Sequence, residues 1–144
     1  MPLLPPPPYT VVIVEDTYEL RCLWKLMLDR DERFAVVAEA ANGRIGVAEV
    51  ELHQPDLVLL DIAMPVMDGI QALSLIRRRS PRSTVVMHSA FSQDSAQAAL
   101  ARRMGAHAFI RNGLRRQVLL GQLETILRRR SGAAGTSAQF HTVE

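Results

Sequence analysis

Cysteine is nearly absent from this chain of 144 residues, which carries only Cys22. A single cysteine cannot form an intramolecular disulfide framework or a metal–thiolate cluster, so both are excluded. No stretch approaches the roughly 18 consecutive apolar residues that a membrane span needs. The first residues also lack the basic segment and the long apolar core of a signal peptide. We therefore expect a soluble protein of the reducing cytoplasm.

The chain has the length for one hydrophobic core, and both of its ends have compositions that do not fit a core. Residues 1–8 include four consecutive prolines, which favour an extended polyproline II arm. Residues 131–138 are rich in Ser, Gly and Ala without an apolar period, as flexible linkers are. The sequence thus predicts a disordered arm at 1–8, one domain at 9–130, and a flexible tail or linker at 131–144.

Between these limits, short β-branched runs alternate with amphipathic stretches. Continuous apolar runs such as residues 57–60 are typical of a parallel sheet that is covered on both faces. We expect strands near residues 11–14, 34–38, 57–60, 84–88 and 107–111, and helices near 20–28, 43–52, 70–78, 93–104 and 114–129. This pattern predicts a doubly wound α/β domain with five parallel strands and five helices, connected by right-handed crossovers.

Charge is unevenly distributed, although the formal net charge is only +2. Residues 1–71 hold five basic and twelve acidic groups, a balance of −7, and residues 72–144 hold twelve basic and three acidic groups, a balance of +9. One interpretation is a set of solvated arginines on outward helix faces. The other is an arginine-rich surface that attracts an acidic protein or a nucleic acid.

Polar side chains follow the predicted strands where each strand ends. In open parallel sheets, ligands bind at the carboxyl ends of the strands, so these side chains are the candidates for chemistry. They are Glu15 and Asp16 after the first strand, Asp61 at the end of the third, Ser89 after the fourth, and Arg111 or Asn112 after the fifth.

Three of these candidates are carboxylates, which would repel one another and raise their pKa values unless a cation held them. With oxygen ligands only and no expected His or Cys ligand, Mg²⁺ is favoured over Zn²⁺. Since Mg²⁺ commonly uses one or two carboxylates together with water and phosphate oxygens, one carboxylate remains free to act as a nucleophile.

Four stretches of the sequence resemble the receiver-domain family of two-component response regulators. They are Val-Val-Ile-Val-Glu-Asp at 11–16, Asp-Leu-Val-Leu-Leu-Asp-Ile-Ala-Met-Pro-Val-Met-Asp-Gly at 56–69, Val-Val-Met-His-Ser-Ala at 85–90, and Gly-Ala at 105–106 before Phe109. The second stretch is the most specific, because an acidic strand end, Met-Pro and Asp-Gly occur in the family's order and spacing. The resemblance covers residues 9–130 and implies a flavodoxin-like sheet with strand order 2-1-3-4-5.

The resemblance also implies a chemistry and a set of roles. Asp61 would accept a phosphoryl group from a phosphohistidine, and Glu15, Asp16, Asp61 and the backbone carbonyl of Ala63 would hold Mg²⁺. Phosphoryl transfer needs in-line positioning and neutralisation of charge, which such a site supplies. The chain would catalyse only its own phosphotransfer and autodephosphorylation, and would not be an enzyme in any wider sense.

A switch and a set of partners follow from the same resemblance. Ser89 would donate its hydroxyl to a phosphoryl oxygen, and Phe109 would change rotamer as Ser89 moves. A sensor histidine kinase or phosphotransfer protein would supply the phosphoryl group. A downstream protein, or a second copy of the chain, would bind the face formed by the fourth helix, the fifth strand and the last helix. No membrane partner is expected, and direct binding of nucleic acid is not favoured.

Each residue also has a plainer interpretation. Asp16 with Glu19 forms an acidic pair that could cap a helix. Ser89 alone is more often a turn hydroxyl, and Phe109 alone is more often a core residue. His88 alternates to the other side of its strand from Ser89, so we assign it a structural role rather than that of a base.

The sequence departs from the family pattern after the fifth strand. Asn112 stands where receivers carry a lysine, and Gly113 stands where a proline usually follows. An asparagine amide can hydrogen-bond a phosphoryl oxygen but brings no positive charge. Arg111 could replace the lysine only if the strand register slipped, because period two points its side chain away from the side of Asn112.

Two hypotheses of different classes follow. The first is a phosphorylatable switch, which is favoured by the retained Glu15, Asp16, Asp61 and Ser89. The second is a phosphorylation-uncoupled receiver that works as a protein-binding or nucleic-acid-binding module, which is favoured by Asn112.

Overall fold

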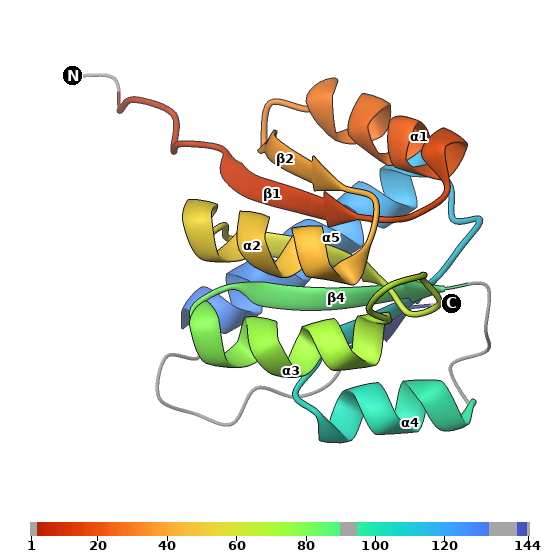
Figure 1. The fold of residues 1–144 in the computed structure, drawn as a ribbon. Coiled ribbons are helices and arrows are strands. Elements are labelled where there is room, and N and C mark those ends of the chain that lie inside the picture. The colour runs from red at the N-terminus through yellow and green to blue at the C-terminus, as the bar shows by residue number, and fades with distance from the viewer. Residues whose placement is uncertain (1–2, 90–94, 133–140, 144) are drawn as a thin grey trace.

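The computed structural model describes residues 3–89, 95–132 and 141–143, and within them a single parallel sheet lies between two layers of helices (Figure 1). Residues 3–8, the described part of the proline-rich arm, form no helix or strand. The elements alternate along the chain. They are β1 (Tyr9–Val14), α1 (Tyr18–Asp29), β2 (Phe34–Ala40), α2 (Gly43–His53), β3 (Leu57–Asp61), α3 (Gly69–Arg79), β4 (Thr84–Ser89), α4 (Ala96–Arg103), β5 (Ala108–Arg111), α5 (Arg116–Gly132) and β6 (His141–Val143).

The sheet has the order β2-β1-β3-β4-β5-β6, and every pairing is parallel. Its first five positions confirm the predicted order 2-1-3-4-5. β1, β3 and β4 are buried on both faces over most of their length, which explains their continuous apolar runs at residues 11–14, 57–60 and 85–87.

Two hydrophobic clusters fill the space on either side of the sheet. One joins the sheet to α1 and α5 through residues such as Trp24, Leu28 and Leu123. The other joins it to α2, α3 and α4 through residues such as Val50 and Leu73. Because successive strand residues point to opposite faces, each polar residue at a strand end belongs to one side or the other.

The sixth strand adds to the predicted fold. Residues 141–143 lie in the segment whose composition predicted a flexible tail or linker, and they pair with β5 in parallel register. The free edge of β5 offers unpaired backbone groups, which a short extended segment can satisfy whatever its composition. α5 also continues to Gly132, slightly beyond the predicted end of the domain.

None of the helices in the described part of the chain has the length and apolarity needed to cross a membrane.

Candidate functional site

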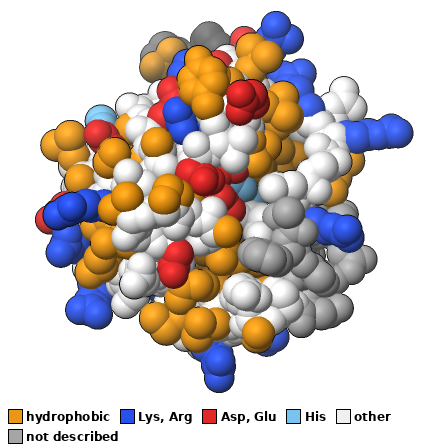
Figure 2. All heavy atoms as spheres, turned by 45° about the vertical axis from the view of Figure 1, so that its right-hand side comes forward, with side chains coloured by type: hydrophobic (Ala, Val, Ile, Leu, Met, Phe, Trp, Pro, Cys, Tyr) orange, Lys and Arg blue, Asp and Glu red, His pale blue; other side chains and the backbone are white. Residues whose placement is uncertain are grey.

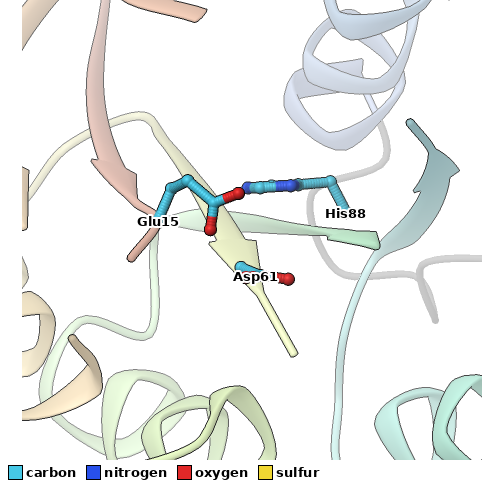
Figure 3. A group of neighbouring side chains, drawn as sticks. All are labelled: Glu15, Asp61 and His88. Atoms are coloured by element: carbon cyan, nitrogen blue, oxygen red, sulfur yellow. The ribbon is translucent and has the colours of Figure 1, made fainter. Parts of the chain in front are cut away.

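Three side chains from neighbouring strands meet at the carboxyl end of the sheet. Asp61, the last residue of β3, is directly paired with His88 of β4, and Glu15 follows Val14, whose partner is Leu60. This register places Glu15, Asp61 and His88 level with one another on the same face of the sheet. Each offers a possible ligand atom, and these atoms all lie within 4.8 Å of one another (Figure 3). All three residues are buried, and His88 is fully so.

The two carboxyl groups have raised pKa values. The pKa of Glu15 rises to about 9, first because the group is buried and then because of Asp61 and Asp16. Burial also raises the pKa of Asp61, with the charge of Asp16 adding to the effect and the Glu15 carboxyl opposing it. Without a cation, the pair therefore shares a proton that resides mainly on Glu15. A divalent cation would displace this proton.

The residues fit such a cation on a second ground. One oxygen of Glu15, Oε2, is buried and has no hydrogen-bond partner among the described residues. A buried carboxylate oxygen without a partner is costly unless a ligand satisfies it. Figure 2 shows the face that includes this end of the sheet, where acidic side chains gather near the centre beside the atoms of a histidine.

Asp16 lies beside this group but is exposed. Its charge contributes to the raised pKa values of Glu15 and Asp61. The N-cap of α1 is Thr17, and the helix begins at Tyr18, so the interpretation of Asp16 as the helix cap is wrong. The physical reason is that the cap position falls one residue later, at Thr17. The Asp16 carboxylate is therefore not used as the helix cap and lies exposed beside the site. Ala63 follows in the exposed loop after β3.

Ser89 and Phe109, the expected switch residues, are both buried. Ser89 ends β4, and its carbonyl oxygen accepts a hydrogen bond of 3.0 Å from the backbone N–H of Asn112. Phe109 pairs with Met87 and packs in the cluster beneath α3 and α4. Both side chains thus lie inside the domain, and residues 90–94, which follow Ser89 in the chain, lie outside the described residues.

The loop after β5 differs from the family pattern in structure as well as in sequence. Asn112 comes two residues after Ile110, the partner of His88, and its Oδ1 is buried without a hydrogen-bond partner in the described structure. Arg111 is exposed, and it alternates to the other face from Ile110. Gly113 has φ 101°, a left-handed conformation that proline cannot adopt. Within this register, the side chains of Arg111 and Asn112 point to opposite faces of the sheet.

Helix α3 is held tightly against the end of β3. Asp68 and Gln71 form a reciprocal capping box, and the N–H of Gly69 donates to the carbonyl oxygen of Ile62 at 2.7 Å. A Cβ on Gly69 would clash with the carbonyl oxygen of Asp61. The Asp-Gly motif therefore brings the helix as close as possible to the candidate acceptor.

A second glycine, Gly43 at the start of α2, contacts the loop between β3 and α3. The N–H of Gly43 donates to the carbonyl oxygen of Met67 at 3.2 Å, and a Cβ on Gly43 would clash with that oxygen. The loop from Ile62 to Asp68 is thus fixed between the N-termini of two helices.

His88 is the site residue that sequence reasoning missed. Its ring does alternate away from Ser89, but that side of the strand is the side on which Asp61 lies. The expectation that no histidine stands near the carboxylates is therefore wrong. Aligning the ends of the two predicted strands could have revealed it, because a polar residue that follows three apolar residues, 85–87, then falls beside Asp61.

The environment of His88 keeps the ring neutral. Complete burial lowers its pKa to about 4, and the nearby Asn112 amide only partly offsets this shift without a well-formed hydrogen bond. The Trp24 ring lies against it at a centroid distance of 5.0 Å. Neither ring nitrogen has a hydrogen-bond partner within the described part of the chain.

Comparison with known proteins identifies relatives of this arrangement. Residues 11–124 match the family described as the response regulator receiver domain. A protein-glutamate methylesterase/protein-glutamine glutaminase of Rhodospirillum rubrum is 40% identical over 100 residues, which cover 69% of this chain and 26% of the relative. The chemotaxis protein CheY of Bacillus subtilis is 41% identical over 87 residues, which cover 60% of this chain and 72% of the relative. The chain thus spans about a quarter of the length of the methylesterase relative.

Solved structures show the same architecture. The response regulator domain of CheB from Thermotoga maritima has a TM-score of 0.76 and 30% identity, covering 86% of this chain and 97% of that chain. A chain of the CheX–CheY–BeF3–Mg²⁺ complex from Borrelia burgdorferi has a TM-score of 0.76 and 30% identity, covering 83% of this chain and 89% of that chain. The match over residues 11–124 and these relatives show that the chain belongs to the response regulator receiver domain family.

Proposed function

We propose that this receiver domain works in a phosphorelay by accepting a phosphoryl group on Asp61. The observation that carries the proposal is the position of Asp61, which is buried at the carboxyl end of β3 beside Glu15, a carboxyl group with an unpartnered oxygen. Phosphoryl transfer depends mainly on positioning and on neutralisation of charge, and a carboxylate fixed at a strand end beside a cation site would supply both.

The reaction balances with residues of this chain and a phosphohistidine donor. An oxygen of Asp61 forms a bond to phosphorus while the P–N bond of the donor breaks. The donor's imidazole leaves with the electron pair and takes up a proton. Ser89 would donate its hydroxyl to a phosphoryl oxygen, and Phe109 would follow the movement of Ser89.

A divalent cation completes the proposal. Glu15, Asp16, Asp61 and the Ala63 carbonyl would hold Mg²⁺, whose charge offsets that of the phosphoryl oxygens when it is bound. Loss of the proton shared by Glu15 and Asp61 frees the Asp61 carboxylate to attack. One structural neighbour was solved as a complex with BeF3 and Mg²⁺, which supports Mg²⁺ as the cation proposed for this chain.

The experiment is phosphorylation by a small donor followed by intact-mass measurement. The protein is incubated with acetyl phosphate or phosphoramidate and Mg²⁺, with and without EDTA, and Asp61→Asn is treated in parallel. We expect an added phosphoryl mass that EDTA and Asp61→Asn each abolish. An adduct that survives either change would reject the assignment.

The partner face is proposed on the charge of the second half of the chain. The surface of α4, β5 and α5 carries the exposed arginines Arg102, Arg103, Arg115 and Arg116. A histidine kinase or phosphotransfer protein would load Asp61, and a downstream protein or a second copy of the chain would bind this face. Its positive charge would favour an acidic partner surface.

A second candidate function is favoured by the loop after β5. Asn112 brings no charge to the site, Arg111 is exposed, and Gly113 has a conformation closed to proline. These features fit a receiver that binds its partner whether or not Asp61 is phosphorylated. Partner binding that is equally tight before and after treatment with phosphoramidate would favour this second function over the first.

A further inference from the structure

The imidazole of His88 lies in the acidic site, where the family pattern has carboxylates and a backbone carbonyl. We propose that His88 is a metal ligand, and that it makes the site of Glu15, Asp61 and His88 prefer a divalent transition metal such as Zn²⁺ or Co²⁺ to Mg²⁺. The inference rests on the cation site of the proposed function and goes beyond it by naming a nitrogen ligand and the class of metal.

The geometry places all three ligands within reach of one ion. Three atoms within 4.8 Å of one another surround a point about 2.8 Å or less from each of them. Bonds from zinc to nitrogen or carboxylate oxygen are about 2.0–2.2 Å long, so each side chain would move by less than about 1 Å. Figure 3 shows the imidazole and the Glu15 carboxylate pointing toward one another, with Asp61 next to them. Paired strands fix two of the three ligands.

The polar atoms of the group are available. His88 is fully buried, and both of its ring nitrogens lack hydrogen-bond partners among the described residues. Glu15 Oε2 lacks a partner as well. Buried polar atoms without partners in a folded protein require an explanation, and a bound ion would satisfy an atom on each of these two side chains.

A second buried histidine shows what a structural role looks like in this fold. His107 Nδ1 accepts a hydrogen bond of 3.0 Å from the backbone N–H of Val85. His88 has no such bond among the described residues, and its ring packs against Trp24. The difference between the two residues points to a ligand for His88.

The donor set decides the class of metal. Mg²⁺ prefers oxygen ligands and near-ideal octahedral geometry, whereas imidazole suits Zn²⁺ and its neighbours in the first transition row. Catalytic zinc sites use three protein ligands, drawn from imidazole, carboxylate and thiolate groups, and keep one position open for water or substrate. Glu15, Asp61 and His88 offer three such ligands, and the open position could take water or a phosphoryl oxygen.

The test compares metal affinities of the whole chain and two matched variants. Other possible zinc ligands, Cys22, His53 and His141, are first replaced by Ser, Gln and Gln. Competition with a chromophoric chelator then gives Zn²⁺ and Co²⁺ affinities, and calorimetry gives the Mg²⁺ affinity. His88→Val removes the proposed ligand, and His107→Asn is the control for changing a buried histidine elsewhere.

We expect the parent protein to bind Zn²⁺ at least about 100-fold more tightly than Mg²⁺. His88→Val should weaken Zn²⁺ binding by about 100-fold and Mg²⁺ binding by less than about threefold, and His107→Asn should change neither. Equal effects of His88→Val on both metals, or no effect on either, would overturn the proposal.

Spectroscopy keeps the test decisive if His88→Val does not fold. In the parent protein, addition of Zn²⁺ should shift the ¹⁵N resonance of one His88 ring nitrogen, and zinc X-ray absorption should show imidazole scattering. An unshifted His88 resonance in the zinc-loaded protein would overturn the assignment. Phosphoryl uptake with Mg²⁺ alone is measured separately, so a failure of this inference is distinguishable from a failure of the proposed function.

Discussion

The two ends of the sheet differ in whether their buried polar atoms have hydrogen-bond partners. At the amino end they have partners: the hydroxyls of Ser80 and Ser83 share a hydrogen bond of 2.6 Å, and Thr84 accepts one of 2.7 Å from Arg130. His107 accepts from the N–H of Val85. At the carboxyl end, buried atoms without partners occur on four described residues, namely Glu15, Trp24, His88 and Asn112.

This difference suits the amino end to stabilising the fold and the carboxyl end to binding a ligand. A fully bonded polar network fixes a unique packing, and removing one of its members leaves another group unsatisfied. Unsatisfied atoms are costly in the free fold and become favourable only when a ligand arrives. The amino end therefore stabilises the domain, whereas the carboxyl end holds groups whose partners come from outside.

The largest expected effect belongs to Asp61→Asn. This change should abolish phosphorylation, yet in metal-free buffer it should leave the free energy of unfolding unchanged or raise it by roughly 1 kcal/mol, because it removes a charge from a buried acidic group. Urea denaturation with chelator present measures the stability, and intact mass measures the adduct. A loss of several kcal/mol would show that the acidic group stabilises the fold.

His107→Ala, at the amino end of the sheet, should lower the free energy of unfolding. The variant leaves the Val85 N–H without its acceptor and opens a cavity, so we expect a loss of about 2–4 kcal/mol in the free energy of unfolding. His88→Val is the matched change at the carboxyl end. It replaces unbonded nitrogens with apolar atoms and should cost less than about 1 kcal/mol without metal. Equal losses in the two variants would contradict the contrast between the ends.

Acid should weaken the domain through His107. Burial, with the charges of Arg130 and Arg77, lowers its folded-state pKa to about 3, whereas the unfolded chain titrates near 6.5. As pH falls below about 6.5, the unfolded state binds the proton first, so the free energy of unfolding falls, by about 3 kcal/mol near pH 4. His107→Asn keeps a possible acceptor that does not titrate. Between pH 7 and pH 4, the free energy of unfolding of His107→Asn, measured by denaturation, should therefore fall less than that of the parent protein. An equal fall in the two proteins would contradict the assignment.

Asn112→Lys should tighten the coupling between phosphorylation and conformation. Hydrogen bonds to charged groups contribute only about 1.5–3 kcal/mol, which is similar to the coupling free energies of switches. With lysine present, the phosphorylation-dependent NMR shifts around Ser89 and Phe109 should grow, and Arg111→Ala should change them little. A parent protein that is already fully switched, with Arg111→Ala abolishing the switch, would show that Arg111 acts as the lysine.

The smallest expected effect concerns Arg115 and Arg116, which lie just before α5 and at its first position. Exposed ion pairs are worth about 0–1 kcal/mol each, so Arg115→Ala with Arg116→Ala should weaken partner or self-association only modestly. Rising salt should weaken the association of the parent protein in the same way. Calorimetry or sedimentation at low and high salt measures both effects. Association unchanged by the double variant and by salt would place the contact on another face.

The sequence predicted the fold well because strand and helix periods are local properties. The alternation of strands and helices follows from apolar runs and periods, and the position of Asp61 at the end of β3 follows from the end of such a run. The order of the first five strands was implied by the resemblance to the receiver family. β6 was not predictable, because its pairing depends on the free edge of β5 rather than on its own composition.

The position of His88 beside the carboxylates was also missed, because it depends on which residues face each other across strands. A one-residue change of register would have turned its ring to the other face. The cap of α1 at Thr17 shows the same limit, since a shift of one residue changes what Asp16 can do. Single positions at element ends are the least certain part of sequence reasoning.

The two glycines that hold the loop after β3 have a consequence for genetics. Gly43 and Gly69 carry no side chain that could take part in the chemistry, yet any side chain at either position would meet a backbone carbonyl oxygen. In a library of all single substitutions that is assayed by signalling, Gly43 and Gly69 should therefore tolerate substitution as poorly as Asp61. Cellular abundance would tell them apart, because altered glycines should lower the amount of folded protein, whereas an Asp61→Asn protein should accumulate normally and remain silent.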